Sequence, residues 1–292
     1  MNKILLIGSN GQVGQELQQT LQPLGNLISL GRKELDLSQP ETISQFITKI
    51  KPSHIINAAA YTAVDKAESE SELVQIINSS APTIISQTAQ KLGATFLHIS
   101  TDYVFDGNNY TPYTETDTPN PVSVYGESKL LGEKGIQENC KQHLILRTAW
   151  VYGNRGHGNF VKTMLRLGAD REELRIVADQ IGTPTHSQEI AKVIPQLLEI
   201  DAAPGIYHFT NSGVASWYDF AVAIFEEAKQ LGCPLKIKRV IPITTPEYPT
   251  PAKRPAYSVL SNTKINQTLG NHSPHWRDSL REMIKTWVIK MI

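Results

Sequence analysis

Tyr125 and Lys129 are two side chains whose types and spacing suit proton transfer. They lie four residues apart, so on a helix they would share one face. A tyrosine hydroxyl ordinarily has a pKa of about 10, and a nearby ammonium lowers that pKa by favouring the phenolate. A tyrosine tuned in this way can donate or accept a proton near neutral pH. Composition alone supplies about 0.6 such pairs by chance, so the pair needs support from its surroundings.

A threonine stands where it could join this pair. The segment from Thr95 to Ser100 is expected to form a strand, and Thr101 follows it, 24 residues before the tyrosine. A hydroxyl at the carboxyl end of a strand could hydrogen-bond a substrate carbonyl and share with Tyr125 the charge that develops on oxygen. The alternative for Thr101 is a turn-forming hydroxyl. We therefore expect Tyr125, Lys129 and Thr101 to be catalytic.

Three glycines, Gly8, Gly11 and Gly14, follow the first expected strand and open the first expected helix. Glycines let the chain turn tightly and let its backbone approach a pyrophosphate, and the helix N-terminus offers free N–H groups and a partial positive charge. The spacing alone is a weak signal, but its place between a strand and an amphipathic helix strengthens it. The turn predicts a dinucleotide site, with a plain tight turn as the alternative.

Arg32 follows the second expected strand, where NAD-preferring sites usually place a carboxylate for the ribose 2′-hydroxyl. An arginine there suits a 2′-phosphate. This pattern favours NADPH as the cofactor. Glu34 and Asp36 lie close enough to keep NADH open, and a solvated loop residue is the alternative for Arg32.

Short apolar runs alternate with helical patterns through the first half of the chain. The expected strands are 4–7, 26–30, 54–57, 95–100 and 144–149. The expected helices are 12–21, a helix up to Ile50 that begins with a capping box of Ser38 and Glu41, 78–92 with Gly93 just past its end, and 125–140. This alternation predicts an α/β fold with a Rossmann-like, doubly wound parallel sheet.

The second half is more mixed. Its expected helices are 186–199, 217–231 and 274–291, its expected strands are 205–210 and 236–240, and the segments 108–122 and 241–255 are expected to be irregular. We expect a dinucleotide-binding domain over 1–152, which also includes about 184–215. We expect 153–292 to form most of a smaller, interleaved α+β substrate-binding domain over the carboxyl ends of the strands.

Composition limits the partners and the location. Lys plus Arg and Asp plus Glu each total 28, so no net charge favours a nucleic-acid partner. No apolar run is long enough to span a membrane, and no signal peptide is recognised, so we expect a cytoplasmic protein. The two cysteines and eight histidines show no metal-site spacing. A monomer and a homodimer are both compatible with the sequence.

Five longer segments resemble the dTDP-4-dehydrorhamnose reductases, a family of extended short-chain dehydrogenases/reductases. They are Asn57–Glu68, Ser100–Gly107, Val124–Leu130, Arg147–Gly153 and Pro249–Pro255, and the resemblance covers essentially the whole chain. It implies that NAD(P)H delivers hydride to C4 of dTDP-4-dehydro-6-deoxy-L-mannose, which gives dTDP-L-rhamnose.

The resemblance also implies roles for individual residues. Tyr125 would donate a proton to the C4 oxygen, and Lys129 would tune Tyr125 and hold the nicotinamide ribose. The residues implied to contact the cofactor, together with the glycines and Arg32, are Gln12, Val13, Asp36, Leu37, Ala60, Tyr61 and Thr62. Those implied to contact the substrate are Thr101, Asp102, Trp150 and Arg254. Some members dimerise around a metal, and Glu189 could match one such position, although a surface glutamate is the stronger interpretation.

Three other functions share this fold pattern. A sugar-nucleotide 4,6-dehydratase would need a glutamate after Asp102, where this chain has Tyr103. A 4-epimerase would retain its NAD through the catalytic cycle, whereas a reductase releases it. A regulatory subunit resembling that of methionine adenosyltransferase would act by binding a partner, and the intact set of Thr101, Tyr125 and Lys129 argues against it.

Overall fold

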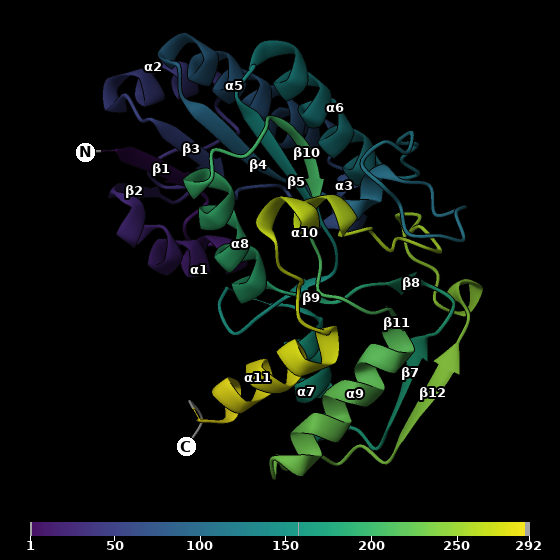
Figure 1. Cartoon of the computed structure of the whole chain (residues 1–292). Helices are drawn as coiled ribbons and strands as arrows, with labels where there is room; N and C mark the ends of the chain where they lie inside the picture. The colour runs from purple at the N-terminus through teal and green to yellow at the C-terminus, as the bar shows by residue number, and fades with distance from the viewer. Residues whose placement is uncertain (1, 157, 290–292) are drawn as a thin grey trace.

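The computed structural model describes residues 2–156 and 158–289, and its centre is a six-stranded sheet (Figure 1). The strand order is β10-β5-β4-β3-β1-β2, and every neighbouring pair is parallel. The strands are β1 (Lys3–Ile7), β2 (Asn26–Leu30), β3 (His54–Asn57), β4 (Thr95–Thr101), β5 (His143–Thr148) and β10 (Gly205–His208). The expected α/β, Rossmann-like architecture is confirmed.

Helices cover both faces of this sheet. One layer holds α1 (Gln12–Thr20) and α8 (Ser187–Glu199), and the other holds α2 (Pro40–Ile50), α5 (Ala81–Leu92) and α6 (Val124–Asn139) (Figure 1). Strand side chains alternate between the two layers: Ile4 and Leu6 join one apolar cluster, whereas Leu5 and Ile7 join the other. This double burial explains why the strands are continuous apolar runs.

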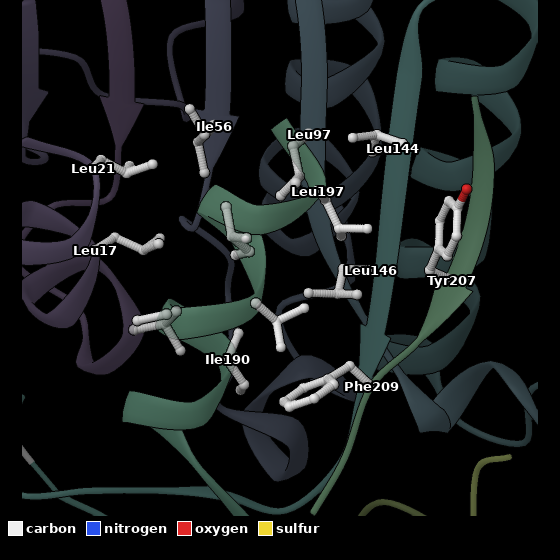
Figure 2. Close-up of a cluster of buried hydrophobic side chains, with 14 of the residues drawn as sticks. Leu17, Leu21, Ile56, Leu97, Leu144, Leu146, Ile190, Leu197, Tyr207 and Phe209 are labelled. Carbon is white, nitrogen blue, oxygen red and sulfur yellow. The ribbon is translucent and has the colours of Figure 1, made fainter. Parts of the chain in front are cut away.

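Figure 2 shows the first of these clusters. Side chains of α1 and α8 meet the strands there, and the labelled residues are Leu17, Leu21, Ile56, Leu97, Leu144, Leu146, Ile190, Leu197, Tyr207 and Phe209. All of them are buried. Helix α8 therefore covers the sheet although it begins 180 residues after the end of β1 in the chain.

Helix boundaries follow local sequence in most places. Gly93 takes a left-handed conformation with φ +66° after α5, as expected. The predicted capping box at Ser38 is wrong: α2 begins at Pro40, and the Ser38 hydroxyl donates to Asp36 instead. The helix predicted from residue 78 also differs in its start: α5 begins at Ala81, because the preceding residues Ile76–Ser80 form a π-helical turn.

The remaining elements form a smaller part below the sheet in Figure 1. They include α7 (Phe160–Asp170), β7 (Glu173–Val177), α9 (Trp217–Gln230), β12 (Arg239–Ile243) and α11 (Trp276–Ile289), while α10 (Thr263–Leu269) lies against β10. The short elements are α3 (Val64–Ala67), α4 (Ser71–Gln75), β6 (Val151–Tyr152), β8 (Ile181–Gly182), β9 (Thr185–His186) and β11 (Ala215–Ser216). A separate apolar cluster is built from α7, α9 and α11. Along α11 it contains Trp276, Leu280, Met283 and Ile284, which recur at helical spacing, and Trp287 packs against it.

Several expectations for this part need correction. The strand predicted at 236–240 lies at Arg239–Ile243, because residues 236–239 first hydrogen-bond Gly168 and Glu172 at the end of α7. Helices α7 and α10 and strand β7 were not predicted. The helix expected from 274 begins at Trp276, and its expected end at Met291 lies outside the described residues.

The apolar cluster between the sheet and helices α1 and α8, and the separate cluster of α7, α9 and α11, support a division of the chain into two domains. We propose a dinucleotide-binding domain over 1–152 together with about 184–215, and a substrate-binding domain made mostly of the rest. The support is that α8 and β10 pack with the sheet, whereas α7, α9 and α11 pack with one another.

Candidate active site

A cavity of about 750 Å³ opens at the carboxyl ends of the strands. A volume of this size is typical of ligand sites. It brings together most of the sequence-predicted residues, namely Gly8, Gly11, Gln12, Val13, Arg32, Asp36, Leu37, Ala60, Tyr61, Thr62, Thr101, Asp102, Tyr125, Lys129 and Trp150. Gly14 and Arg254 are not among its lining residues in the described part of the chain. A second cavity of about 490 Å³, beside Asn211 and Asn262, holds none of the predicted residues.

The glycine turn is shaped by close backbone contacts. Gly8 has φ +86°, and a Cβ there would lie 2.5 Å from the Ala59 nitrogen. A Cβ on Gly14 would lie 2.0 Å from the Gly8 carbonyl oxygen, so Gly14 supports the turn from beneath rather than lining the cavity. Gly11 caps α1 without a side-chain hydrogen bond, which leaves the first N–H groups of the helix available. The turn therefore fits a dinucleotide diphosphate.

Arg32 and Asp36 also line the cavity. Their side chains form an ion pair, with Arg32 Nε 3.4 Å from Asp36 Oδ2. Asp36 also accepts hydrogen bonds from the backbone N–H and hydroxyl of Ser38, and the backbone bond is the largest cause that lowers the Asp36 pKa. The Arg32 side chain is 75% exposed, so its guanidinium has room to meet a ligand.

Tyr125 and Lys129 lie on α6, which begins where the Ser123 hydroxyl accepts a hydrogen bond from the Gly126 N–H. Both side chains are buried beneath the cavity surface. Lys129 Nζ donates to the Ile99 carbonyl at 2.8 Å and meets His98 Nε2 at 2.8 Å. Strand β4 thus holds the amine in place, with Thr101 at its end.

The pKa of Tyr125 differs from the sequence-based expectation. Burial raises it to about 12, and hydrogen bonding with Thr101 opposes the rise. The expected lowering by Lys129 is wrong for this state, because burial of the phenol dominates. Burial also lowers the pKa of Lys129 to about 8, against the charge of Glu133, which raises it. Tyr125 therefore carries its proton at neutral pH, as a proton donor must.

Asp102 places a buried carboxyl beside this pair. Its Oδ1 accepts from the Thr101 hydroxyl at 3.0 Å, and the residue is 2% exposed. Burial raises the Asp102 pKa to about 6, although hydrogen bonding to the carboxylate opposes the rise. The ring of Tyr103 packs edge-on against Tyr125, with centroids 5.4 Å apart, so Tyr103 also shapes the site.

Two tryptophans form one wall of the cavity. Trp150 was predicted, whereas Trp217, at the first position of α9, was not. Trp150 has φ +47°, an unusual conformation for a bulky residue, and its indole lies against Gly182, where a Cβ would come within 2.5 Å of the ring. The capping box of Ser216 and Asp219 marks the start of α9 in the sequence, but nothing there places Trp217 beside Trp150.

Arg254 does not reach the cavity. Its guanidinium donates to both carboxylate oxygens of Asp65, at 3.0 and 2.9 Å, and also to Thr250 and Ala252. Burial acts to lower the Arg254 pKa, but the Asp65 carboxylate raises it overall. Arg254 in this conformation ties the late Pro-rich segment to α3, which is a structural contact.

Glu189, a candidate metal-site residue, forms an ion pair in the structure. Glu189 pairs with Lys192 on α8, with Lys192 Nζ 2.7 Å from Glu189 Oε1. Over residues 2–156 and 158–289, no group of three or more His, Cys, Asp or Glu side chains is arranged to hold a metal ion. In the same residues, no helix has the length and apolar character needed to cross a bilayer.

Known proteins resemble this chain in sequence and architecture. The family model described as RmlD substrate binding domain matches residues 1–289. The dTDP-4-dehydrorhamnose reductase of Escherichia coli (strain K12) is 46% identical over an alignment of 290 residues, and the match covers 96% of each chain. The solved structure of such a reductase from Clostridium acetobutylicum has a TM-score of 0.91 at 42% identity, and the match covers 97% of this chain and 99% of that one.

A second solved structure carries a cofactor. It is the dTDP-4-dehydrorhamnose reductase of Bacillus anthracis in complex with NADP, with a TM-score of 0.91 and 37% identity over 98% of this chain and 100% of that one. Identity at this level over nearly the full length shows common family as well as common fold. The chain therefore belongs to the dTDP-4-dehydrorhamnose reductase family.

Proposed function

We propose that this protein reduces the C4 ketone of dTDP-4-dehydro-6-deoxy-L-mannose to dTDP-L-rhamnose with NADPH. One observation carries the proposal: the glycine turn and the Thr101, Asp102 and Tyr125 group line one and the same cavity. A dinucleotide bound at the turn would reach toward the buried tyrosine. The relatives' reductase activity supports the same reaction.

Each residue would have its own role in the reaction. The cofactor supplies the hydride, and the backbone of Gly11, Gln12 and Val13 would hold its diphosphate. Tyr125 would donate its proton to the ketone oxygen, because the buried phenol is protonated at neutral pH. Thr101 would stabilise the developing oxyanion by a hydrogen bond, and Lys129 would hold the ribose side of the cofactor.

NADPH is proposed over NADH because of Arg32. Its exposed guanidinium lines the cavity next to Asp36, and it could pair with a 2′-phosphate. The NADP-bound relative from Bacillus anthracis supports this choice. Asp36 keeps NADH as the alternative, since a carboxylate there could accept a ribose hydroxyl.

Absorbance at the nicotinamide band tests the reaction directly. The purified protein is given the dTDP-4-keto sugar with NADPH or NADH in parallel assays. We expect stoichiometric cofactor oxidation, faster with NADPH, and dTDP-L-rhamnose as the product. Absence of oxidation with either cofactor would refute the reductase proposal. Tightly retained NAD without net oxidation would favour an epimerase.

Two further expectations from the sequence remain predictions. A monomer or a homodimer is expected, and light scattering of the purified protein would distinguish them. A cytoplasmic location is expected, and cell fractionation would test it.

A further inference from the structure

Three buried side chains from three elements form a hydrogen-bonded row behind the cavity. Lys129 Nζ on α6 lies 2.8 Å from His98 Nε2 on β4, and His98 Nδ1 lies 3.1 Å from Asn57 Nδ2 on β3. Each residue is at most 1% exposed. Within the described chain, Lys129 lines the cavity, whereas His98 and Asn57 do not. His98 and Asn57 can therefore act on a ligand only through Lys129.

The backbone fixes the orientation of the Asn57 amide. Its Oδ1 accepts a hydrogen bond from the Ala59 N–H at 3.0 Å. If the amide were reversed, its NH₂ group would face that N–H, and two donors would oppose each other. The Asn57 Nδ2 group, which can only donate, therefore faces His98. His98 Nδ1 must accept this hydrogen bond and carries no proton.

The remaining proton of the imidazole is then on the other nitrogen. His98 is neutral, because its complete burial holds its pKa well below the ordinary value. A neutral imidazole has one N–H, so with Nδ1 bare the proton is on Nε2. That proton points at Lys129 Nζ. Only an uncharged amine has the lone pair to accept it, while one of its own hydrogens goes to the Ile99 carbonyl.

We propose that Asn57 and His98 are positioning residues that place a proton on His98 Nε2 and thereby favour the uncharged amine of Lys129 in the cofactor-free protein. If Lys129 were an ammonium, its N–H would face the Nε2–H of His98, and two donors would oppose each other. If the ring proton moved to His98 Nδ1 instead, it would face the NH₂ group of Asn57, which is also a donor. The proposal concerns where protons lie, and only its bearing on turnover rests on the proposed function.

The other groups around Lys129 are compatible with this state. Burial favours the neutral amine, in the same direction as the row of hydrogen bonds. Glu133, one turn along α6, favours the ammonium, but Arg147 Nη2 lies 2.6 Å from Glu133 Oε2 and pairs with this carboxylate. Tyr125, one turn before Lys129, is protonated and adds no charge.

Nitrogen-15 NMR of the cofactor-free wild-type protein tests the proposal directly. The ring nitrogens of His98 are assigned by through-bond correlation to its backbone. At pH 9, above the Lys129 pKa of about 8, we expect a proton on Nε2 and an unprotonated Nδ1. A proton on Nδ1, or an imidazolium, would overturn the proposal, whatever the enzyme does with a sugar nucleotide. Conversely, an inactive enzyme with the expected tautomer would refute the proposed function alone.

The substitution Asn57→Asp should reverse the direction of the hydrogen bonds in the row. One carboxylate oxygen would still accept from the Ala59 N–H, while the other would accept a proton from His98 Nδ1. His98 Nε2 would then accept from a Lys129 ammonium. We expect the ring proton on Nδ1 and the titration midpoint of the Lys129 ¹³Cε signal about one pH unit higher or more.

Asn211→Asp is the matched control. Asn211 is a buried amide that hydrogen-bonds Pro274 and Ser279 outside the row, so the substitution adds a buried carboxylate without touching His98. It should leave both the tautomer and the Lys129 midpoint unchanged. An unchanged tautomer in Asn57→Asp, or an equal shift in the control, would contradict the proposal. If Asn57→Asp does not fold, the wild-type tautomer decides the question.

Discussion

The indole of Trp150 lies flat against that of Trp217, with ring centroids 3.6 Å apart and planes 5° from parallel. Trp150 follows β5 of the sheet, whereas Trp217 opens α9 of the smaller part, so the stack joins the two parts at the cavity wall. Stacked aromatic pairs contribute about 0.5–1.5 kcal/mol beyond their buried area. The stack can therefore act as a rigid platform beside the proposed sugar site.

Replacing Trp217 should weaken substrate binding more than cofactor binding. For Trp217→Leu we expect the KM of the sugar nucleotide to rise about tenfold, which corresponds to about 1.4 kcal/mol. The dissociation constant of NADPH, measured by fluorescence titration, should change little. Trp287→Leu is the control, because Trp287 packs in the cluster of α7, α9 and α11 away from the cavity. Equal changes for both ligands in Trp217→Leu would contradict a role in the sugar site.

Gly14 and Gly11 should respond differently to a methyl group. In Gly14→Ala the new Cβ would meet the Gly8 carbonyl at 2.0 Å, so the turn must shift, which we expect to cost about 1–3 kcal/mol of unfolding free energy. In Gly11→Ala the nearest such contact is 3.4 Å, and stability should hold. Because Gly11 lines the cavity, its variant should still lose NADPH affinity. Denaturant unfolding and NADPH titration check both variants, and an unperturbed Gly14→Ala would contradict this account of the turn.

Asp102 makes a pH-dependent prediction about stability. Its pKa rises from 3.8 to about 6 on burial, so the folded state binds a proton more tightly than the unfolded state does. Stability therefore falls as pH rises from about 4 to about 6, and the full penalty of about 3 kcal/mol is present above that range. Asp102→Asn should remove the penalty.

The measurement is denaturant unfolding of Asp102→Asn and wild type at pH 8 and near pH 4. We expect the variant to be more stable at pH 8, by up to about 3 kcal/mol, and to lose this advantage near pH 4. Its turnover should fall, because Asp102 lines the cavity beside Thr101 and Tyr125. A stability gain that is the same at both pH values would show that burial of the charge is not its cause.

Glu133 should matter for stability through Arg147. Both side chains are almost fully buried, and the Glu133 carboxylate also accepts from Ser100, the residue before Thr101. Glu133→Gln would leave the Arg147 charge unpaired, at a cost of about 3–5 kcal/mol. Glu173→Gln, which breaks an exposed pair with Arg239, should cost less than about 1 kcal/mol. Similar unfolding free energies for the two variants would contradict this difference.

The parts of the structure that local sequence determines were predictable. Strands β1, β3, β4 and β5 are short apolar runs buried on both faces, and Gly93 ends α5 because it accepts φ above zero. The spacing of Tyr125 and Lys129 on one helix placed them together without knowledge of the fold. Even α7 had a usable signal, since Asn159 caps it and Val161, Met164 and Leu165 follow at helical spacing.

Contacts between distant segments could not be predicted. Trp217 contacts Trp150 although the two are 67 residues apart in the sequence, and Arg254 contacts Asp65 at a separation of 189 residues. Neither pairing therefore leaves a local pattern in the sequence. The same is true of the Lys129, His98 and Asn57 row, which depends on the pairing of β3 with β4. The direction of the Tyr125 pKa was also missed, because burial of the phenol is a tertiary effect.

Turnover and cofactor binding of Tyr125→Phe test the central claim most directly, because this substitution removes only the phenolic hydroxyl. Single-turnover oxidation of NADPH by the dTDP-4-keto sugar measures turnover, and fluorescence titration measures NADPH affinity. The proposed role of Tyr125 as proton donor predicts a turnover at least about 100-fold lower, with NADPH affinity within about threefold of wild type, since the diphosphate would be held at the glycine turn. Near-normal turnover in Tyr125→Phe would contradict that role.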